Sequence, residues 1–415
     1  MRVQKCKGTR DLSPQEMAVF RLIEGAFREC CLKWGYQEVK TPTIEYLHLF
    51  TSTGTLTPGM LGKVYSFLDW DGWSGERVVL RPDGTIPVAR LYIDEMSEKA
   101  LAKLFYIASV FIFEETGQET RERWQCGAEL IGAGSTTADV ELIILSLETL
   151  QSLGLTGVEI RLSHAGLIGA LLARLGVSPE EQVKLFDRFL DGDTAALARI
   201  KRGKAEPGHA LSLLLDQKGK SAGFLKNLAT LFSQKTPELE RSLQNFINIV
   251  ELLDALGYQY TIDISSGRGF EYYTGLIFQL FSGKEKIGGG GRYDALIPLM
   301  GGSDTPASGF ALYLDHLMNQ VKPAATTMTT KPGILISTEP DRTETLKEGF
   351  AMANRLHRDG YPAEVNLGNQ EPSNFKWLLN IQSRQPRIVL TDRIDNQKFE
   401  TKDTSEVLTL LSRES

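Results

Sequence analysis

The chain has 415 residues, more than a single compact core usually holds, so two or three domains are expected. Its hydrophobic fraction of 42% and charged fraction of 24% are ordinary for a globular protein. The formal net charge of −6 provides no global electrostatic attraction to nucleic acid or to an acidic membrane.

The first residues contain no apolar segment of the signal-peptide type, and no apolar run reaches the length of a membrane span. The cysteines lack the spacing of metal ligands, and Cys30 and Cys31 lie within a helical apolar pattern. Buried thiols are typical of a reducing compartment. We therefore expect a cytoplasmic protein without a membrane partner or a metal site.

Helical and strand patterns alternate over the first 164 residues. Residues 13–16, Ser-Pro-Gln-Glu, form a capping box with proline in the first helical position, and the helix is expected to end at Gly35. A second amphipathic helix is expected over 139–150. Runs rich in β-branched and aromatic residues predict strands. The expected strands are 36–39, 64–68, 78–80, 104–113 and 158–162.

Over 165–257 the spacing of the apolar residues is almost entirely that of helices, and strand patterns then resume. These later strands are expected at 260–264, 272–281 and 288–293. A helical block within a strand-rich region indicates an insertion in one core domain. The expected domains are a core formed by 1–164 and 258–321, a helical insertion over 165–257, and a C-terminal domain over 332–415.

A linker rich in Thr, Pro and Lys separates the C-terminal domain from the core. Beyond it the pattern predicts the order β-α-β-α-β, which is a small α/β domain. The expected strands are 334–336, 363–365 and 388–390, and the expected helices are 345–357 and 375–381.

Three glycine-containing segments are candidates for a binding site. Asp83 lies in a turn before a helix, where it either binds an ammonium group or caps the helix; alone, the segment favours the cap. In segment 267–275, glycines flank Arg268. This pattern supports two interpretations equally, a ligand site or a hairpin with core aromatics. The two tyrosines that follow would face opposite sides of a strand. Gly288–Gly291 indicates close backbone approach to a ligand or a strand, or a flexible turn.

These motifs, in this order, resemble the histidyl-tRNA synthetase family. The family comprises a class II aminoacyl-tRNA synthetase and its histidine-biosynthesis paralogue, the regulatory subunit of ATP phosphoribosyltransferase. The resemblance starts at Lys7–Asp11, includes a segment over 41–45 similar to the family's dimer motif, and covers nearly the whole chain. It implies an α+β fold in which helices flank an antiparallel sheet. It also implies a helical insertion, a C-terminal domain like an anticodon-binding domain, and a homodimer.

The resemblance implies a histidine pocket. Asp83 corresponds to a family glutamate that binds the α-amino group, and it is shorter by one methylene. Gln125 and Glu129 correspond to residues that line the amino-acid site. Arg268 corresponds to a family arginine that neutralises the carboxylate side of the reaction. Tyr272 and Tyr273 correspond to a pair of residues that contact the imidazole.

The same resemblance implies that the ATP side is impaired. Ile112 stands where the family's F-R-x-E motif, here ending at Glu114, has an arginine for the α-phosphate. His316 stands where the family has a second arginine, which binds the far phosphates of ATP. Arg121, which matches a family ATP contact, and Arg123 remain on the hairpin. Losing one preorganised donor typically costs about 10²–10³ in rate, and isoleucine cannot hydrogen-bond a phosphate. No catalytic residue is therefore expected.

The leading hypothesis is a non-catalytic regulatory subunit of ATP phosphoribosyltransferase that acts in the first step of histidine biosynthesis. It would form a homodimer within a larger hetero-oligomer with the short-form catalytic subunit, bind histidine and need no cofactor. A tRNA partner is not expected, because the basic run 199–204 is typical of a solvated turn. The first alternative is a histidine–tRNA ligase that uses ATP and Mg²⁺. The second is a stand-alone histidine- or tRNA-binding protein.

Overall fold

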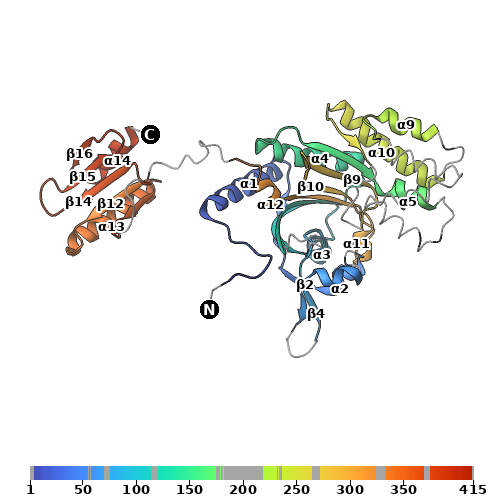
Figure 1. The fold of residues 1–415 in the computed structure, drawn as a ribbon, viewed down its shortest axis with the longest axis horizontal. Helices are drawn as coiled ribbons and strands as arrows, with labels where there is room; N and C mark the ends of the chain where they lie inside the picture. Colours follow the sequence, from blue (N-terminus) through green and yellow to red (C-terminus); the bar gives the residue numbers. More distant parts are fainter. Residues whose placement is uncertain are drawn as a thin grey trace. The chain divides into compact units, whose positions relative to one another are not determined.

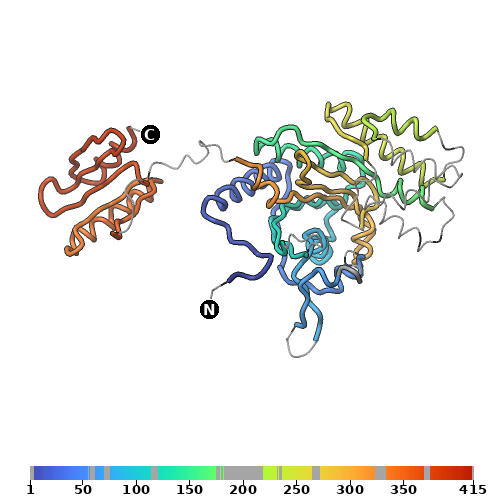
Figure 2. Tube along the Cα trace, viewed as in Figure 1, coloured from blue at the N-terminus to red at the C-terminus, as the bar shows by residue number. Residues whose placement is uncertain are grey.

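The structure is a computed structural model with two compact units, Met1–Lys322 and Pro323–Ser415, and each is considered by itself (Figures 1 and 2). The residues that it describes are 4–54, 56, 58–69, 75–113, 120–173, 178, 181, 218–230, 232, 236–263, 272–322, 333–368 and 374–413.

An eight-stranded sheet with the order β1-β5-β6-β11-β10-β9-β7-β8 forms the centre of the first unit. Its strands are antiparallel except for the edge pairs β1–β5 and β7–β8, which are parallel. The strands are β1 (Gln37–Glu38), β5 (Ala102–Phe111), β6 (Glu122–Ile131), β7 (Glu159–His164), β8 (Thr261–Ile262), β9 (Leu276–Ser282), β10 (Glu285–Arg292) and β11 (Ala307–Tyr313).

A second, three-stranded antiparallel sheet has the order β2-β4-β3. Its strands are β2 (Ile44–Tyr46), β3 (Ser66–Leu68) and β4 (Arg77–Leu80). The helices of the unit are α1 (Pro14–Lys33), α2 (Leu47–Ser52), the 3-10 helix η1 (Pro58–Lys63), α3 (Thr85–Glu95), α4 (Thr136–Ser152), α5 (Ala165–Ala173), α9 (Ala222–Thr230), α10 (Pro237–Ala255), α11 (Leu296–Leu299) and α12 (Leu314–Met318).

The two faces of the main sheet belong to two hydrophobic cores. Successive side chains of a strand point to opposite faces. Accordingly Phe105 joins the larger core with α1, α4, α5, α9, α10 and α12, whereas Tyr106 joins the smaller core with α2, α3 and α11. Figure 1 shows α1, α4 and α10 on one side of the sheet and α3 on the other. The candidate site lies on the α3 side.

The first helix confirms the prediction made from its capping box. The side chain of Ser13 accepts a hydrogen bond from the backbone N–H of Glu16, and the Glu16 carboxylate accepts one from the Ser13 N–H at 2.7 Å. Gly35 follows the helix with a φ of 80°, a conformation that glycine adopts without strain. Cys30 and Cys31 are buried in this helix, also as predicted.

The glycine run lies within strand β10, so the strand expected at 288–293 is confirmed and the alternative of a flexible turn is wrong. A Cβ atom on Gly288 would lie 2.8 Å from the carbonyl oxygen of Ala311, and one on Gly289 would lie 2.7 Å from that of Phe278. Both carbonyls belong to the neighbouring strands. The alternative of close backbone approach to another strand is therefore confirmed.

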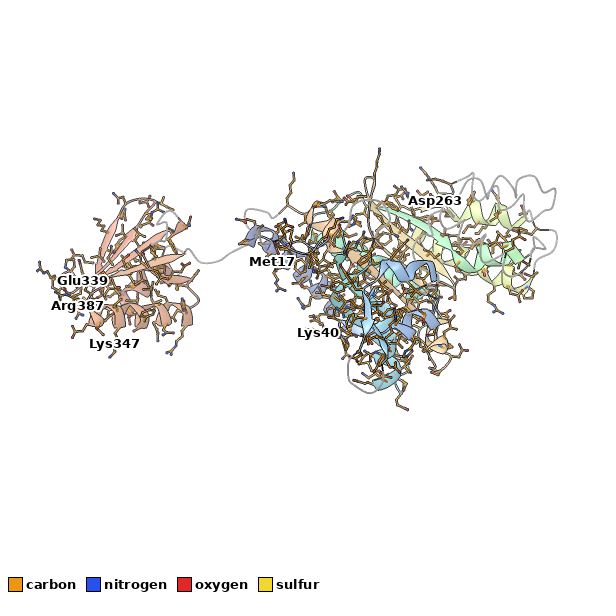
Figure 3. The ribbon with its side chains drawn as sticks, turned by 60° about the horizontal axis from the view of Figure 1, so that its bottom comes forward. Met17, Lys40, Asp263, Glu339, Lys347 and Arg387 are labelled. Atoms are coloured by element: carbon orange, nitrogen blue, oxygen red, sulfur yellow. The ribbon has the colours of Figure 1, made fainter. Side chains whose placement is uncertain are left out.

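The C-terminal unit is a five-stranded sheet with the order β13-β12-β14-β15-β16 and the helices α13 and α14. The charged side chains of Lys347 and Arg387 project from its outside (Figure 3). β12 is parallel to β13 and β14, and β15 is antiparallel to both of its neighbours. The elements are β12 (Ile334–Thr338), α13 (Thr343–Arg358), β13 (Ala363–Val365), β14 (Trp377–Ile381), β15 (Ile388–Asp392), β16 (Lys398–Thr401) and α14 (Thr404–Arg413).

The helix predicted over 375–381 is wrong, because this segment forms strand β14. Trp377, Leu379 and Ile381 are buried, whereas Leu378 and Asn380 between them are half-buried and exposed. This spacing of two belongs to a strand, and pairing with β12 and β15 on either side stabilises it. Across both units, no helix among the described residues is long and apolar enough to cross a membrane.

Candidate functional site

Four of the pocket residues expected from the sequence line one cavity on the α3 side of the main sheet. The same cavity is also lined by residues from the start of α3, from β5, from the glycine-rich strands and from the end of β10. We call this set the tyrosine pocket. Its lining residues are Asp83, Thr85, Tyr106, Gln125, Tyr272, Tyr273, Gly289, Tyr293, Gly309, Phe310 and Ala311.

Asp83 caps a helix and contacts the pocket at the same time. Its Oδ1 accepts a hydrogen bond of 2.8 Å from the Ile86 N–H in the first turn of α3. Its Oδ2 accepts one of 3.1 Å from the hydroxyl of Tyr272, which is distant in sequence. Burial raises the pKa of this carboxyl. The position of Asp83 is therefore compatible with both functions considered for it, which are capping the helix and binding an ammonium group.

Glu129 lies on β6 against the same residues, and its side chain is 1% exposed. The hydroxyl of Thr85 donates to its Oε1 at 2.8 Å, and the hydroxyl of Tyr293 donates to its Oε2. Burial raises the pKa of Glu129 to about 8, the nearby Asp83 adds to this shift, and the hydroxyl donors oppose it. At neutral pH the carboxyl is therefore predominantly a neutral acid.

Glycines provide the space that the pocket side chains occupy. A Cβ atom on Gly309 would overlap the carboxyl of Glu129. Cβ atoms on Gly84 and Gly127 would overlap the ring of Tyr106. The pocket therefore depends on three glycines from a turn and two strands.

The tyrosines pack edge to face within the smaller core. The ring centroids of Tyr272 and Tyr273 are 5.4 Å apart, and those of Tyr272 and Tyr293 are 5.6 Å apart. The expectation that Tyr272 and Tyr273 face opposite sides is wrong, because both line the cavity. They precede β9 in irregular backbone, where the alternation of a strand does not apply. Burial raises the pKa of these three tyrosines, so their hydroxyls stay protonated.

Thr85, Tyr106 and Tyr293 also line the pocket but were not among the residues expected from the sequence. Thr85 lies two residues after Asp83, and Tyr293 lies two residues after the last glycine of the run 288–291. Tyr106 lies in a strand that is largely buried on both faces, so no alternation of polar residues distinguishes it.

The cavity of the tyrosine pocket is small. It measures about 10 Å³, close to the volume that one water molecule needs. Sites for small molecules typically measure about 300–1,000 Å³. A ligand of amino-acid size therefore requires displacement of lining side chains.

The expected nucleotide side combines apolar and aromatic side chains with two arginines. Ile112 is half-buried and follows the last residue of β5, which therefore ends two residues earlier than predicted. The guanidinium of Arg121 lies 4.6 Å from the centre of the Phe113 ring and donates to the hydroxyl of Tyr65 at 3.3 Å. Arg123 is half-buried on β6, paired across the ladder with a residue of β5.

His316 on α12 contacts an acidic residue. Its Nδ1 lies 2.7 Å from Oε1 of Glu285, and the side-chain amide of Gln320 donates to the other oxygen of that carboxylate at 2.8 Å. A carboxylate at this place repels a phosphate group. Two of the other expected site residues, Glu114 and Arg268, lie outside the described residues, as does the basic run 199–204.

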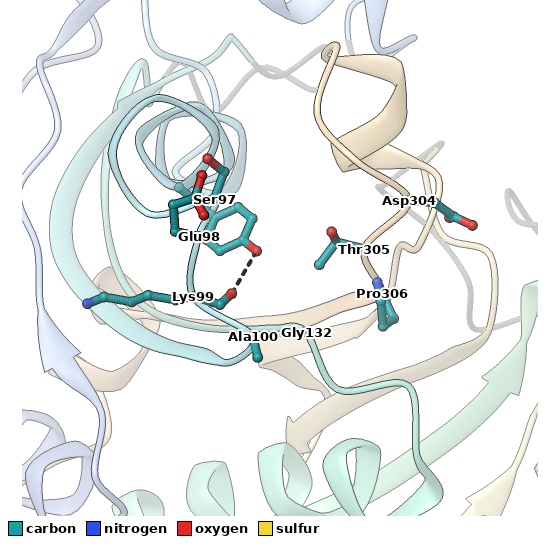
Figure 4. A pocket seen from close by; sticks show the side chains of 9 residues that line it. Ser97, Glu98, Lys99, Ala100, Gly132, Asp304, Thr305 and Pro306 are labelled. Atoms are coloured by element: carbon teal, nitrogen blue, oxygen red, sulfur yellow. Dashed lines mark hydrogen bonds between the residues drawn. The ribbon is translucent and has the colours of Figure 1, made fainter.

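Two larger cavities contain none of the site residues expected from the sequence. One, of about 320 Å³, lies between the turn after α3 and the segment before β11 (Figure 4), with Tyr92 donating to the carbonyl of Lys99 at its edge. The other, of about 600 Å³, lies between α5 and the start of α10, with Arg241 and Glu238 among its lining residues.

Comparison with known proteins identifies the family. The model of the histidyl-tRNA synthetase family matches residues 8–317. An ATP phosphoribosyltransferase regulatory subunit of Dehalococcoides mccartyi is 50% identical over 412 residues, which cover 99% of each chain. This chain belongs to the histidyl-tRNA synthetase family. A histidine–tRNA ligase of Methanocaldococcus jannaschii, also similar, is 32% identical over 88% of this chain and 86% of its own.

The fold agrees with this family. A solved structure from Bacillus halodurans, described as an ATP phosphoribosyltransferase regulatory subunit/histidyl-tRNA synthetase, superposes with a TM-score of 0.79. It is 23% identical and covers 92% of this chain and 99% of its own. The mixed architecture of a large sheet flanked by helices, as predicted, is thus that of histidyl-tRNA synthetase-like proteins.

Proposed function

We propose that this chain is a regulatory subunit of ATP phosphoribosyltransferase and does not activate histidine with ATP. The observation that carries the proposal is the full-length identity of 50% to regulatory subunits, against 32% to a histidine–tRNA ligase. The nucleotide side supports it, because Ile112 cannot bind a phosphate and His316 lies beside Glu285. The transferase chemistry would then belong to a separate catalytic subunit.

The tyrosine pocket is the proposed site for histidine. Asp83 and Gln125 line the cavity together with aromatic rings and offer hydrogen-bonding groups to a zwitterionic ligand. Glu129 lies behind the lining, hydrogen-bonded to Thr85 and Tyr293. Because this cavity is too small for an amino acid, histidine would bind by selecting or inducing a state with a larger cavity. A histidine that binds the two states unequally can relay inhibition to a catalytic partner.

The outer face of the small sheet is the proposed homodimer surface. Ile44, Tyr46 and Phe67 are between 44% and 49% exposed. Tyr46 and Phe67 flank Val78 across the β2–β4–β3 ladder, and Val78 between them is 4% exposed. Large exposed apolar side chains gathered on one small sheet are typical of a protein interface. Buried Arg81 donates to the carbonyls of residues 41 and 42 just before β2, which holds this surface in place.

Replacing Tyr46 and Phe67 together by serine is expected to convert the dimer to a monomer, because two large apolar side chains of the interface are lost. Sedimentation equilibrium at micromolar concentration would measure the mass. Phe350→Ser is the matched control, since Phe350 is 56% exposed on α13 of the other unit. A double variant that stays dimeric would exclude this surface.

The function is tested by two assays on the same preparation. Histidine-dependent ATP–pyrophosphate exchange with Mg²⁺ is expected to be absent. Addition of the chain to a short-form ATP phosphoribosyltransferase catalytic subunit is expected to raise its rate and to confer inhibition by histidine. Exchange at the rate of a synthetase would establish the ligase instead and overturn the proposal.

The third possibility, a stand-alone binding protein, predicts histidine or tRNA binding without any effect on a transferase. The composition of the C-terminal unit does not favour tRNA, because its acidic residues slightly outnumber its lysines and arginines. A gel-shift assay with tRNA at physiological salt would separate this possibility from the regulatory subunit.

A further inference from the structure

The larger of the two cavities outside the tyrosine pocket lies between α5 and the start of α10, two helices that pack against each other (Figure 1). We call it the α5–α10 cavity; residues of α5 from Gly166 to Ala173 line one wall, and residues of the first turns of α10 line the other. Its volume of about 600 Å³ is that of a small-molecule site, typically about 300–1,000 Å³. It shares no lining residue with the tyrosine pocket, so binding to it can be tested separately.

Two opposite charges on the α10 wall line this cavity without pairing. Glu238 and Arg241 are three residues apart, so their side chains are neighbours on one face of the helix. Arg21 and Glu24 have the same spacing on α1 and form an ion pair. Neither Glu238 nor Arg241 forms an ion pair or a side-chain hydrogen bond with any residue that the structure describes, and the same holds for the hydroxyl of Ser242 beside them. An acidic group and a basic group are therefore both available to one ligand.

The α5 wall is apolar and contains a glycine that packing does not require. Gly166 is required by packing, because a Cβ atom on it would lie 2.9 Å from the carbonyl oxygen of Thr274. Gly169 lies one turn later, and a Cβ atom on it would meet nothing within 4 Å. Glycine inside a helix is destabilising relative to alanine. The open space above Gly169 belongs to the cavity, and the methyl groups of Ala170 and Ala173 lie beside it.

We propose that the α5–α10 cavity binds an α-amino acid with an aliphatic side chain. The guanidinium of Arg241 binds the carboxylate, whose planar geometry it matches. The carboxylate of Glu238 accepts hydrogen bonds from the ammonium group. A single carbon separates the two charged groups of an α-amino acid, so one molecule spans two neighbouring side chains of a helix. The aliphatic side chain then lies over Gly169, against the apolar wall.

The lining of the cavity disfavours other classes of ligand. Glu238 repels an inorganic phosphate or a dicarboxylate, and Arg241 repels a polyamine. No aromatic residue of the described chain lines the cavity, so nothing in it stacks on a nucleobase or on an imidazole ring. An aliphatic zwitterion is the class that uses both charges and the apolar wall.

Isothermal titration of alanine, valine and leucine into the full-length protein at neutral pH tests the proposal. Wild type is expected to bind at least one of them. Arg241→Gln and Glu238→Gln are each expected to weaken that binding about tenfold or more, because each variant loses a charge-assisted hydrogen bond. Glu240→Gln is the matched control, since Glu240 is exposed in the same turn of α10 but does not line the cavity.

Filling the cavity provides an independent test. Gly169→Leu places a side chain where the aliphatic part of the ligand lies, and it is expected to prevent binding. Gly25→Leu is the control, because Gly25 is exposed on α1 and a Cβ atom on it also meets nothing within 4 Å. Circular dichroism checks that both variants are folded. If Gly169→Leu is folded and binds as wild type does, the cavity is not the site.

Two analogues of leucine test the ligand class. Isopentylamine lacks the carboxylate and 4-methylpentanoate lacks the ammonium group, and neither is expected to bind measurably. An analogue that binds as tightly as leucine would refute recognition of a zwitterion. The proposal is also overturned if folded wild type binds none of the three amino acids, or if the two charge variants bind them as tightly as wild type does.

Discussion

Replacing Arg292 by methionine is expected to lower the free energy of unfolding of the first unit by about 3–5 kcal/mol. Arg292 is 5% exposed, and its Nη2 lies 2.7 Å from Oδ1 of Asp139, which is 2% exposed. It also contacts Asp294 at 3.0 Å and donates to the carbonyl of Ala133 at 3.1 Å. Without the guanidinium, the carboxylate of Asp139 remains buried and unpaired. Urea unfolding followed by circular dichroism measures the loss.

Arg28→Met is the matched control. Arg28 forms a bidentate pair with Glu38 at 2.8 and 2.9 Å, but the two side chains are 39% and 44% exposed. Exposed pairs contribute about 0–1 kcal/mol. Combining Arg292→Met with Asp139→Leu is expected to recover part of the loss, because both buried charges are then removed. Equal destabilisation by Arg292→Met and Arg28→Met would contradict the argument.

This ion pair illustrates what the sequence could not predict. Arg292 and Asp139 are 153 residues apart, and neither β10 nor α4 contains a local signal for the other. The local feature next to Arg292 is the glycine run 288–291, which gives no sign of an ion pair. The first helix was predictable because its capping box and its terminal glycine are local signals. Segment 375–381 was not, since a short apolar run satisfies both helical and strand spacing until its neighbours are known.

The same distinction applies to the tyrosine pocket. Asp83, Gln125, Tyr272 and Tyr273 were recognised through family motifs, and the structure gathers them around one cavity. The small volume of this cavity was not predictable. It depends on the Tyr106 ring, which fills space that glycines of a turn and of another strand leave open. The protonation of Glu129 was also inaccessible, because it follows from complete burial next to Asp83.

Glu129→Gln is expected to change how the stability of the first unit depends on pH. The pKa of Glu129 rises from the ordinary value of 4.5 to about 8 in the folded protein. Between these values the folded state holds a proton that the unfolded state has released. The stability contributed by this proton is therefore fully present below pH 4.5 and is lost as the pH rises to 8. The difference of 8 − 4.5 pH units corresponds to at most about 5 kcal/mol.

The variant lacks this titration, so its free energy of unfolding relative to wild type is expected to increase by several kcal/mol between pH 4.5 and 8. Urea unfolding of both proteins at pH 5, 6.5 and 8 measures it, and the difference cancels the other carboxyl groups. Glu38→Gln is the control, because the hydrogen bond from Arg28 lowers the pKa of Glu38 and confines its effect to more acidic pH. Parallel curves for Glu129→Gln and wild type would mean that Glu129 is ionised in the folded protein, so that either Asp83 carries the proton instead or the pocket holds two negative charges.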